Sequence, residues 1–115
     1  MKILLIAIDT LRADRLSCYG YEEMTTPNLD RFASNGIKFN NAFSQNNCTQ
    51  SSFTTIYSGK YPITHNIVAQ DGDVYLDDKI SLLPEILQDN RYKTAAIDNL
   101  ELMKPWFTRG YNEYI

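Results

Sequence analysis

The sequence has few cysteines that could cross-link a small secreted domain and few positive charges that could bind a nucleic acid. Only two of its 115 residues are cysteines, Cys18 and Cys48. That is too few for a disulfide-rich scaffold and fits a reducing compartment, with one disulfide left open. The 11 Lys and Arg residues are outnumbered by 14 Asp and Glu residues, which gives a net charge of -3. Because a phosphate backbone is bound by concentrated positive charge, we expect no nucleic-acid partner.

Long hydrophobic runs are also absent. The apolar run at residues 3–8 stops at Asp9, so it is shorter than most signal-peptide cores, and no small-residue cleavage site follows it. No other stretch approaches the roughly 20 apolar residues of a membrane span. We therefore expect no membrane segment and a cytoplasmic location. No repeat, low-complexity tract or linker interrupts the chain, which predicts one continuous unit.

What the sequence does contain is an alternation of strand and helix signals. With 43% hydrophobic residues the chain can bury a core. Apolar and alternating patterns predict strands at residues 3–8, 37–43 and 92–97. Capping and stop signals predict three helices: one starting at Thr26-Pro27 and ending at Asn35-Gly36, one at 51–58 before Gly59, and one capped by Ser81 and running through Leu87.

This order of elements is typical of an α/β layered fold with a mostly parallel central sheet flanked by helices. In such sheets ligands bind at the carboxyl ends of the strands. Asp9 directly follows the predicted strand at residues 3–8, so we expect it at a ligand site.

Two stretches resemble the sulfatase family of the alkaline-phosphatase-like superfamily. The first contains IAIDTLRADRLSCYGY at residues 6–21, TTPNLD at 25–30 and GIKF at 36–39. The second is SGKYP at residues 58–62, followed by His65. The chain therefore resembles the amino-terminal part of a sulfatase-type catalytic domain over residues 1–115. The resemblance implies the alkaline-phosphatase-like layered fold, of which only the amino-terminal part is present.

The resemblance also implies a nucleophile ten residues before the glycine of the second stretch. Counting back from Gly59 reaches Thr49, which begins TQSSF at residues 49–53. The family's motif has proline and arginine where this chain has Ser51 and Phe53. Reading from Cys48 instead lacks both residues and breaks the spacing, so we favour Thr49. Formylglycine, which forms from a cysteine in that proline and arginine context, is not expected here.

The chemistry of these residues is consistent with ester cleavage. A hydroxyl at a helix start lies beside unpaired backbone N–H groups that favour an anionic ester. A divalent cation held by Asp9 and Thr49 would lower the pKa of the Thr49 hydroxyl and make it a nucleophile. Lys60 and His65 would supply positive charge or protonate a leaving group. We therefore predict Thr49, Lys60 and His65 as catalytic residues, and Asp9 and Thr49 as metal ligands.

Each of these residues also has a structural interpretation. Asp9 is a common residue type in turns after strands, and Thr49 is a common helix N-cap. His65, the single histidine, fits an ordinary loop position, and Lys60 fits a solvated surface.

The resemblance further implies a divalent cation: calcium for a sulfatase, or manganese, magnesium or zinc for a phosphate-directed relative. The family completes this site with an Asp-His pair far downstream, and no counterpart occurs before Ile115. A lysine-histidine segment that many sulfatases carry after the third strand is replaced here by Asp98-Asn99-Leu100. This chain alone is therefore expected to be incomplete for catalysis.

The sequence is compatible with three functions. The first is a metal-dependent sulfuric ester hydrolase acting on a small-molecule or glycan sulfate ester. The second is a phosphoester hydrolase or phospho-group transferase of the same superfamily. The third is a non-catalytic binding or assembly module. An exposed sheet edge would also favour a homo-oligomer.

Overall fold

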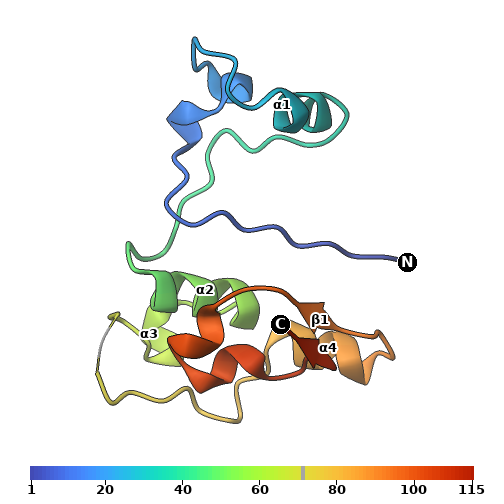
Figure 1. Cartoon of the computed structure of the whole chain (residues 1–115). Helices are drawn as coiled ribbons and strands as arrows, with labels where there is room; N and C mark the ends of the chain where they lie inside the picture. The colour runs from blue at the N-terminus through green and yellow to red at the C-terminus, as the bar shows by residue number, and fades with distance from the viewer. Residues whose placement is uncertain (71) are drawn as a thin grey trace. The chain divides into compact units, whose positions relative to one another are not determined.

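A computed structural model of the chain describes residues 1–70 and 72–115. Their contacts divide the chain into two compact units, Met1–Phe43 and Ser44–Ile115. Figure 1 shows short helices in both units and a pair of short strands in the second. Each unit has its own local packing and is described separately. The predicted extent of the sulfatase-type domain, residues 1–115, stays a prediction.

The first unit begins with an extended segment. Residues 3–8 were expected to form a strand, and that prediction is wrong for the described chain: the segment has no strand assignment. Its large apolar side chains are exposed, with Leu4 at 83% and Ile6 at 70%. An apolar run becomes a buried strand only when partners take up its backbone groups and cover both faces. The described part of the first unit supplies neither.

Short helices follow the extended segment. Two 3-10 turns, η1 (Ala13–Arg15) and η2 (Ser17–Tyr19), lead to α1 (Pro27–Ser34). The sequence prediction for α1 is confirmed at both ends, because Thr26 is the N-cap, Pro27 is the first helical residue and Asn35 is the C-cap. Proline suits this position since its missing N–H would have no helical partner there.

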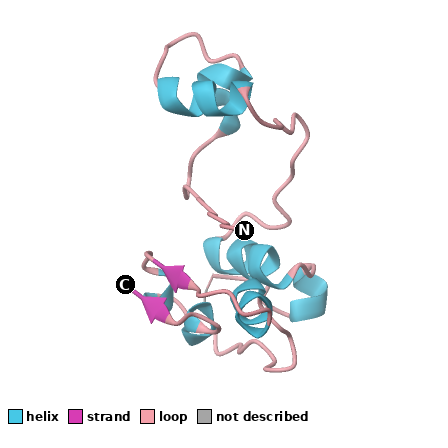
Figure 2. Ribbon diagram, turned by 90° about the vertical axis from the view of Figure 1, so that its right-hand side faces the viewer, coloured by secondary structure: helices cyan, strands magenta, loops and turns pink. Residues whose placement is uncertain are grey.

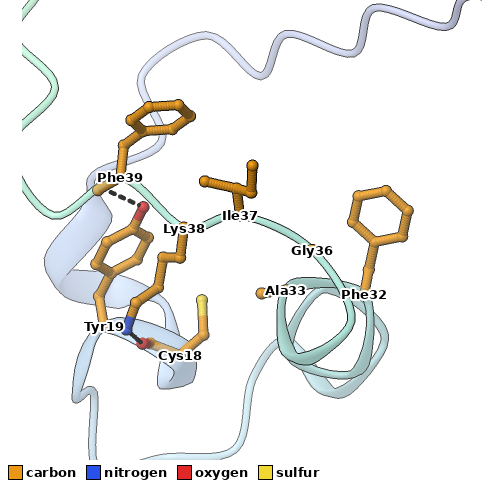
Figure 3. A pocket seen from close by; sticks show the side chains of 8 residues that line it. All are labelled: Cys18, Tyr19, Phe32, Ala33, Gly36, Ile37, Lys38 and Phe39. Carbon is orange, nitrogen blue, oxygen red and sulfur yellow. Dashed lines mark hydrogen bonds between the residues drawn. The ribbon is translucent and has the colours of Figure 1, made fainter.

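The segment after α1 differs from the prediction. Residues 37–43 were expected to form a strand, and that prediction is also wrong for the described chain, because the segment carries no strand assignment. Instead this segment packs back on η2: Tyr19 donates its hydroxyl to the Phe39 carbonyl at 2.8 Å, and Lys38 donates its ammonium to the Cys18 carbonyl at 2.7 Å. Together with residues of α1 they line a hollow of about 190 Å³. Figure 3 shows the side chains that line it.

The second unit is built around three helices, α2 (Thr49–Ser58), α3 (Pro62–His65) and α4 (Leu83–Asp89). The predicted helix at residues 51–58 is confirmed and starts two residues earlier. It ends at Gly59, whose φ of 65° is a left-handed conformation that glycine adopts readily. The helix predicted after Ser81 is also present, but its N-cap is Leu82, whose N–H donates to the Glu85 carboxylate at 2.8 Å.

Two strands, β1 (Ala95–Ala96) and β2 (Glu113–Tyr114), form a parallel pair in the second unit (Figure 2). Ala95 aligns with Glu113, and Ala96 with Tyr114. The predicted strand at 92–97 is therefore confirmed only at its centre. Its pairing is parallel, as expected for the fold class, but the described residues contain only this two-stranded sheet rather than a full central sheet.

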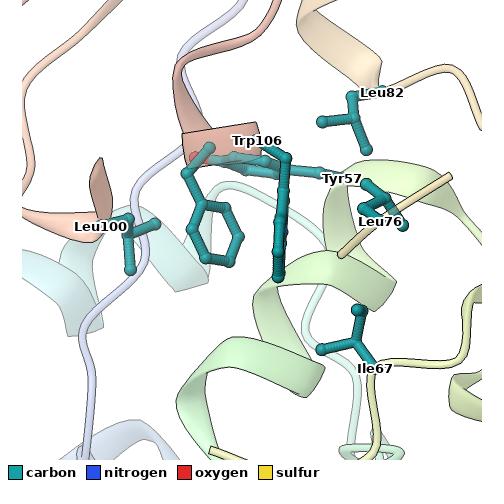
Figure 4. Packing of buried hydrophobic residues seen from close by; sticks show 7 residues of the cluster. Tyr57, Ile67, Leu76, Leu82, Leu100 and Trp106 are labelled. Atoms are coloured by element: carbon teal, nitrogen blue, oxygen red, sulfur yellow. The ribbon is translucent and has the colours of Figure 1, made fainter. Parts of the chain in front are cut away.

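The core of the second unit lies between α2 and the segments that follow α3. Figure 4 shows the buried apolar cluster, which consists of Tyr57, Ile67, Leu76, Leu82, Leu100, Trp106 and Phe107. Two of these residues, Trp106 and Phe107, come from η4 (Pro105–Thr108), which follows η3 (Leu100–Leu102). Burial of this apolar surface is the main force that holds α2 in place.

The loop before β2 is fastened to the first turn of α4. Arg109 donates Nε–H and Nη2–H to the two Glu85 carboxylate oxygens, each at 3.0 Å. Gly110 follows with φ of 78°, and a Cβ at this position would lie 2.2 Å from the Glu85 backbone nitrogen. Only glycine fits so close an approach at this backbone conformation.

Candidate functional site

The predicted nucleophile stands at the start of α2. Thr49 is the first helical residue and is half-buried, and the N-cap Cys48 is extended, with φ of -112° and ψ of 146°. The first helical hydrogen bond runs from Ser52 N to the Cys48 carbonyl at 3.0 Å. The N–H groups of this first turn give the helix start a partial positive charge. The position of Thr49 therefore suits a group that reacts with an anion.

The loop entering α2 is ordered by side-chain hydrogen bonds. Ser44 Oγ donates to the Asn46 carbonyl at 2.6 Å and lies 3.0 Å from Ser52 Oγ. Because a serine hydroxyl has only one hydrogen, the Ser52 hydroxyl must be the donor in this second contact. Asn46 accepts from Cys48 N at 3.1 Å through Oδ1 and donates to the Val68 carbonyl at 3.1 Å through Nδ2.

Buried polar side chains of α2 lie in its first turn and in the turn that follows. Gln50 and Ser51 are 5% and 0% exposed. Thr54 Oγ1 donates to the Gln50 carbonyl at 2.6 Å and accepts the Trp106 Nε1–H at 3.1 Å. These contacts connect the turn that carries Thr49 to the apolar core.

His65, the last residue of α3, packs against α2 and is 2% exposed. Its Nδ1 accepts the Ile67 N–H at 3.1 Å, and its Nε2 lies 3.0 Å from Thr55 Oγ1. An accepting Nδ1 places the proton of the neutral ring on Nε2, which donates to Thr55. Burial lowers the pKa of His65 because it penalises the charged ring. The structure thus holds His65 neutral, with both nitrogens engaged inside the second unit.

Lys60 is exposed and follows Gly59 at the far end of α2. Its backbone N–H donates to Ser58 Oγ at 3.2 Å. A ten-residue helix is about 15 Å long. The described structure therefore brings neither Lys60 nor the Thr55-bound ring of His65 to Thr49, and their predicted catalytic roles stay predictions.

Asp9 belongs to the first unit, where it accepts the Thr10 N–H at 2.9 Å through Oδ1. Thr10 has φ of 59°, a conformation that ends the extended segment in a tight turn.

Within residues 1–70 and 72–115, no three His, Cys, Asp or Glu side chains come together in a way that could hold a metal ion. A divalent cation such as calcium needs six to eight oxygen ligands. One carboxylate and one hydroxyl do not by themselves fit such an ion.

Asp98 stands at the carboxyl end of β1. It accepts the hydroxyl of Tyr114, from β2, and the Leu100 N–H at 2.8 Å. Burial, followed by this hydrogen bond to Asp98, raises the pKa of Tyr114. An acidic side chain with a phenol donor thus occupies the place where the resemblance implies lysine and histidine.

Sequence reasoning missed Asn46 and Ser44 as part of this site. Asparagine two residues before a helix N-cap is a typical Asx-turn residue, and that local signal was available. The partner of its amide group, Val68, lies 22 residues away, and no local pattern specifies such a contact.

Comparison with known proteins points to one family. Residues 2–113 match the family model described as Sulfatase. The chain is 31% identical over 105 residues to N-acetylglucosamine-6-O-sulfatase of Bacteroides thetaiotaomicron, covering 88% of this chain and 18% of that protein. It is 32% identical over 100 residues to mouse iduronate 2-sulfatase, covering 84% and 18%. It is 28% identical over 127 aligned positions to human N-acetylgalactosamine-6-sulfatase, covering 97% and 24%.

The chain thus spans about a fifth of the length of these relatives. No solved structure gives a significant match to it. The helices within residues 1–70 and 72–115 do not have the length and hydrophobicity that a membrane-spanning helix requires.

Proposed function

Because the chain belongs to the sulfatase family, we propose that it forms part of a hydrolase of sulfate esters in which Thr49 is the nucleophile. The family implies the alkaline-phosphatase-like fold, and sulfatases generally use a divalent metal. The observation that carries the proposal is the extent of α2. The helix starts at Thr49 and its C-cap is Gly59, so the ten-residue spacing that the resemblance requires corresponds to one helix and its cap.

In the proposed reaction, the Thr49 hydroxyl at the start of α2 is the nucleophile that cleaves the sulfate ester. The Thr49 oxygen attacks the sulfur of the ester, an O–S bond forms, and the bond from sulfur to the alcohol oxygen breaks. The alcohol leaves with the proton that Thr49 gave up. Water then attacks the sulfur of the covalent sulfo-enzyme, releases sulfate and restores the hydroxyl. The N–H groups of the first turn of α2 favour the negative charge of the ester throughout.

We further propose that Asp9 and Thr49 supply two ligands of the divalent cation, with the others coming from elsewhere in the protein. Such an ion would stabilise negative charge on the ester oxygens. Calcium is the expected ion for sulfate esters, and manganese, magnesium or zinc for phosphate esters. Catalytic roles for Lys60 and His65 and the cytoplasmic location stay predictions.

The substrate class that we propose is a sulfated glycan. Three relatives are named as sulfatases of N-acetylglucosamine, N-acetylgalactosamine or iduronate. Phosphate-ester hydrolysis or transfer is the alternative, favoured by threonine at the nucleophile position. Ser51 and Phe53 in place of the family's proline and arginine favour the non-catalytic module instead.

The test is hydrolysis of 4-nitrophenyl sulfate and 4-nitrophenyl phosphate by the protein at its native length. Thr49→Ala should abolish the faster of the two reactions, and Thr49→Ser should retain part of it because the hydroxyl remains. Thr64→Ala, a change at an exposed threonine of α3, is the matched control. Full activity of Thr49→Ala would refute the assignment of the nucleophile. Inactivity of the unaltered protein on both esters would favour the binding-module alternative.

A further inference from the structure

The loop that precedes Thr49 is tied to a distant part of the second unit by one carboxamide. Asn46 uses both of its polar atoms: Oδ1 accepts the Cys48 N–H, and Nδ2 donates to the Val68 carbonyl, each at 3.1 Å. The orientation of the amide is fixed by its partners, because an N–H requires an acceptor and a carbonyl requires a donor. The residue directly before Thr49 is therefore connected to the segment that follows α3.

That segment is itself fastened to α2 by His65. The ring accepts the Ile67 N–H at 3.1 Å through Nδ1 and lies 3.0 Å from Thr55 Oγ1 through Nε2. Ile67, which precedes Val68, is 2% exposed and belongs to the apolar core. The Val68 carbonyl thus stands on backbone that a buried ring and a buried side chain hold in place.

The contacts form a closed path of hydrogen bonds and backbone. It runs from Thr55 in the middle of α2 through His65 and Val68 to Asn46, and returns to the start of the same helix at Cys48. A second contact, between the hydroxyls of Ser44 and Ser52 at 3.0 Å, holds the same loop to the first turn. The backbone at Cys48 is therefore restrained from two sides, which restricts where the Thr49 hydroxyl can lie.

We propose that Asn46 is a positioning residue for Thr49, acting through its bridge from Cys48 to Val68 on the segment that His65 holds against α2. This inference rests on the proposed function, because it concerns the geometry of the proposed nucleophile. It also gives His65 a role that does not require contact with a substrate.

Two substitutions separate the two halves of the bridge. Asn46→Asp keeps an oxygen that accepts from Cys48 but replaces the donor to Val68 by a second acceptor, so the bridge to Val68 is lost. Asn46→Ala removes both contacts. Gln88→Glu makes the same change from carboxamide to carboxylate at an exposed residue of α4 in this unit, and serves as the matched control.

The first readout is catalysis of 4-nitrophenyl sulfate or phosphate hydrolysis by the native-length protein. Asn46→Asp is expected to lower kcat about 10- to 100-fold with a much smaller change in KM, because misplacing a reacting group by about 1 Å costs that much. The Gln88→Glu control is expected to keep both constants. A purely structural role for Asn46 would lower the melting temperature and leave kcat per folded molecule unchanged.

The second readout does not depend on activity. Amide hydrogen exchange in a peptide covering residues 44–50 is expected to be faster in Asn46→Asp than in Gln88→Glu, with other peptides of the unit unaltered. Unaltered exchange and unaltered kcat, together with an inactive Thr49→Ala variant, would overturn the positioning role and keep the proposed function. Equal activity of the unaltered protein and Thr49→Ala would refute the proposed function. Unaltered hydrogen exchange in Asn46→Asp would then also overturn the restraint that the Asn46 bridge places on Cys48.

Discussion

Trp106 donates its indole N–H to the hydroxyl of Thr54 at 3.1 Å, across 52 residues of sequence. Both side chains are buried, with Thr54 at 0% and Trp106 at 4% exposure. The same hydroxyl donates to the Gln50 carbonyl at 2.6 Å. A single oxygen therefore links the aromatic core of the second unit to the first turn of α2, next to Thr49.

Replacing this hydroxyl should destabilise the protein. Thr54→Val keeps the shape of the side chain but leaves the Trp106 N–H buried without an acceptor, which costs about 1–3 kcal/mol of unfolding free energy. Urea denaturation followed by tryptophan fluorescence measures the loss, since the sequence contains a single Trp. The same substitution at exposed Thr64 should change stability little, and a Thr54→Val variant as stable as this control would contradict the contact.

Gly110 should tolerate no side chain. An alanine Cβ would lie 2.2 Å from the Glu85 backbone nitrogen, at a φ of 78°, so the loop must move away from α4. We expect Gly110→Ala to lower the free energy of unfolding by more than about 2 kcal/mol. Gly20→Ala has a similar φ of 97° but meets no atom within 4 Å, and it isolates the backbone strain from the clash. Equal losses at the two glycines would show that the close approach is not formed.

The bidentate ion pair between Arg109 and Glu85 should contribute measurable stability. The side chains are only 20% and 29% exposed, so water screens the pair less than at an open surface. Glu85→Gln removes the charge and one acceptor and should cost about 1–3 kcal/mol. Chemical denaturation compared with Glu101→Gln, at an exposed position of η3, measures it. Identical midpoints for the two variants would refute a contribution from the pair.

Stability should fall at mildly acidic pH because of His65. Burial lowers the folded-state pKa of this ring from its ordinary value of 6.5. Between the folded and unfolded pKa values the unfolded chain binds more protons, so the free energy of unfolding decreases as pH falls below about 6.5. Above that pH the contribution of His65 is fully present.

Melting temperatures between pH 8 and pH 5 measure this effect. Titration of the carboxylates also changes the melting temperature in this range, but it does so equally in all variants. His65→Gln has no proton to bind in this range, so its profile should be flatter than that of the unaltered protein near pH 6. Parallel profiles would contradict a neutral, buried His65.

The elements that were predicted correctly carry their signals locally. Thr26-Pro27 and Asn35 define the two ends of α1, and Gly59 ends α2, because capping depends on backbone conformation within one turn. The strands at residues 3–8 and 37–43 failed for the opposite reason. A strand is defined by the neighbouring strand with which it pairs, and the only sheet within the described residues consists of β1 and β2.

The site shows the same division. The position of Thr49 ten residues before Gly59 could be predicted from the sequence, because this spacing is the length of one helix up to its C-cap. The bridge from Asn46 to Val68, and the burial of His65 against Thr55, join residues 22 and 10 positions apart. Such contacts depend on how α3 folds back on α2, which no local pattern encodes.

Thr49 should become covalently modified during turnover. The most direct measurement is mass spectrometry of the peptide containing Thr49 after rapid acid quenching of the native-length protein with excess 4-nitrophenyl sulfate, with the phosphate ester run in parallel. We expect a mass increase of one sulfo or phospho group on Thr49, absent from Thr49→Ala. Turnover without any modified Thr49, or modification at Cys48 instead, would contradict it.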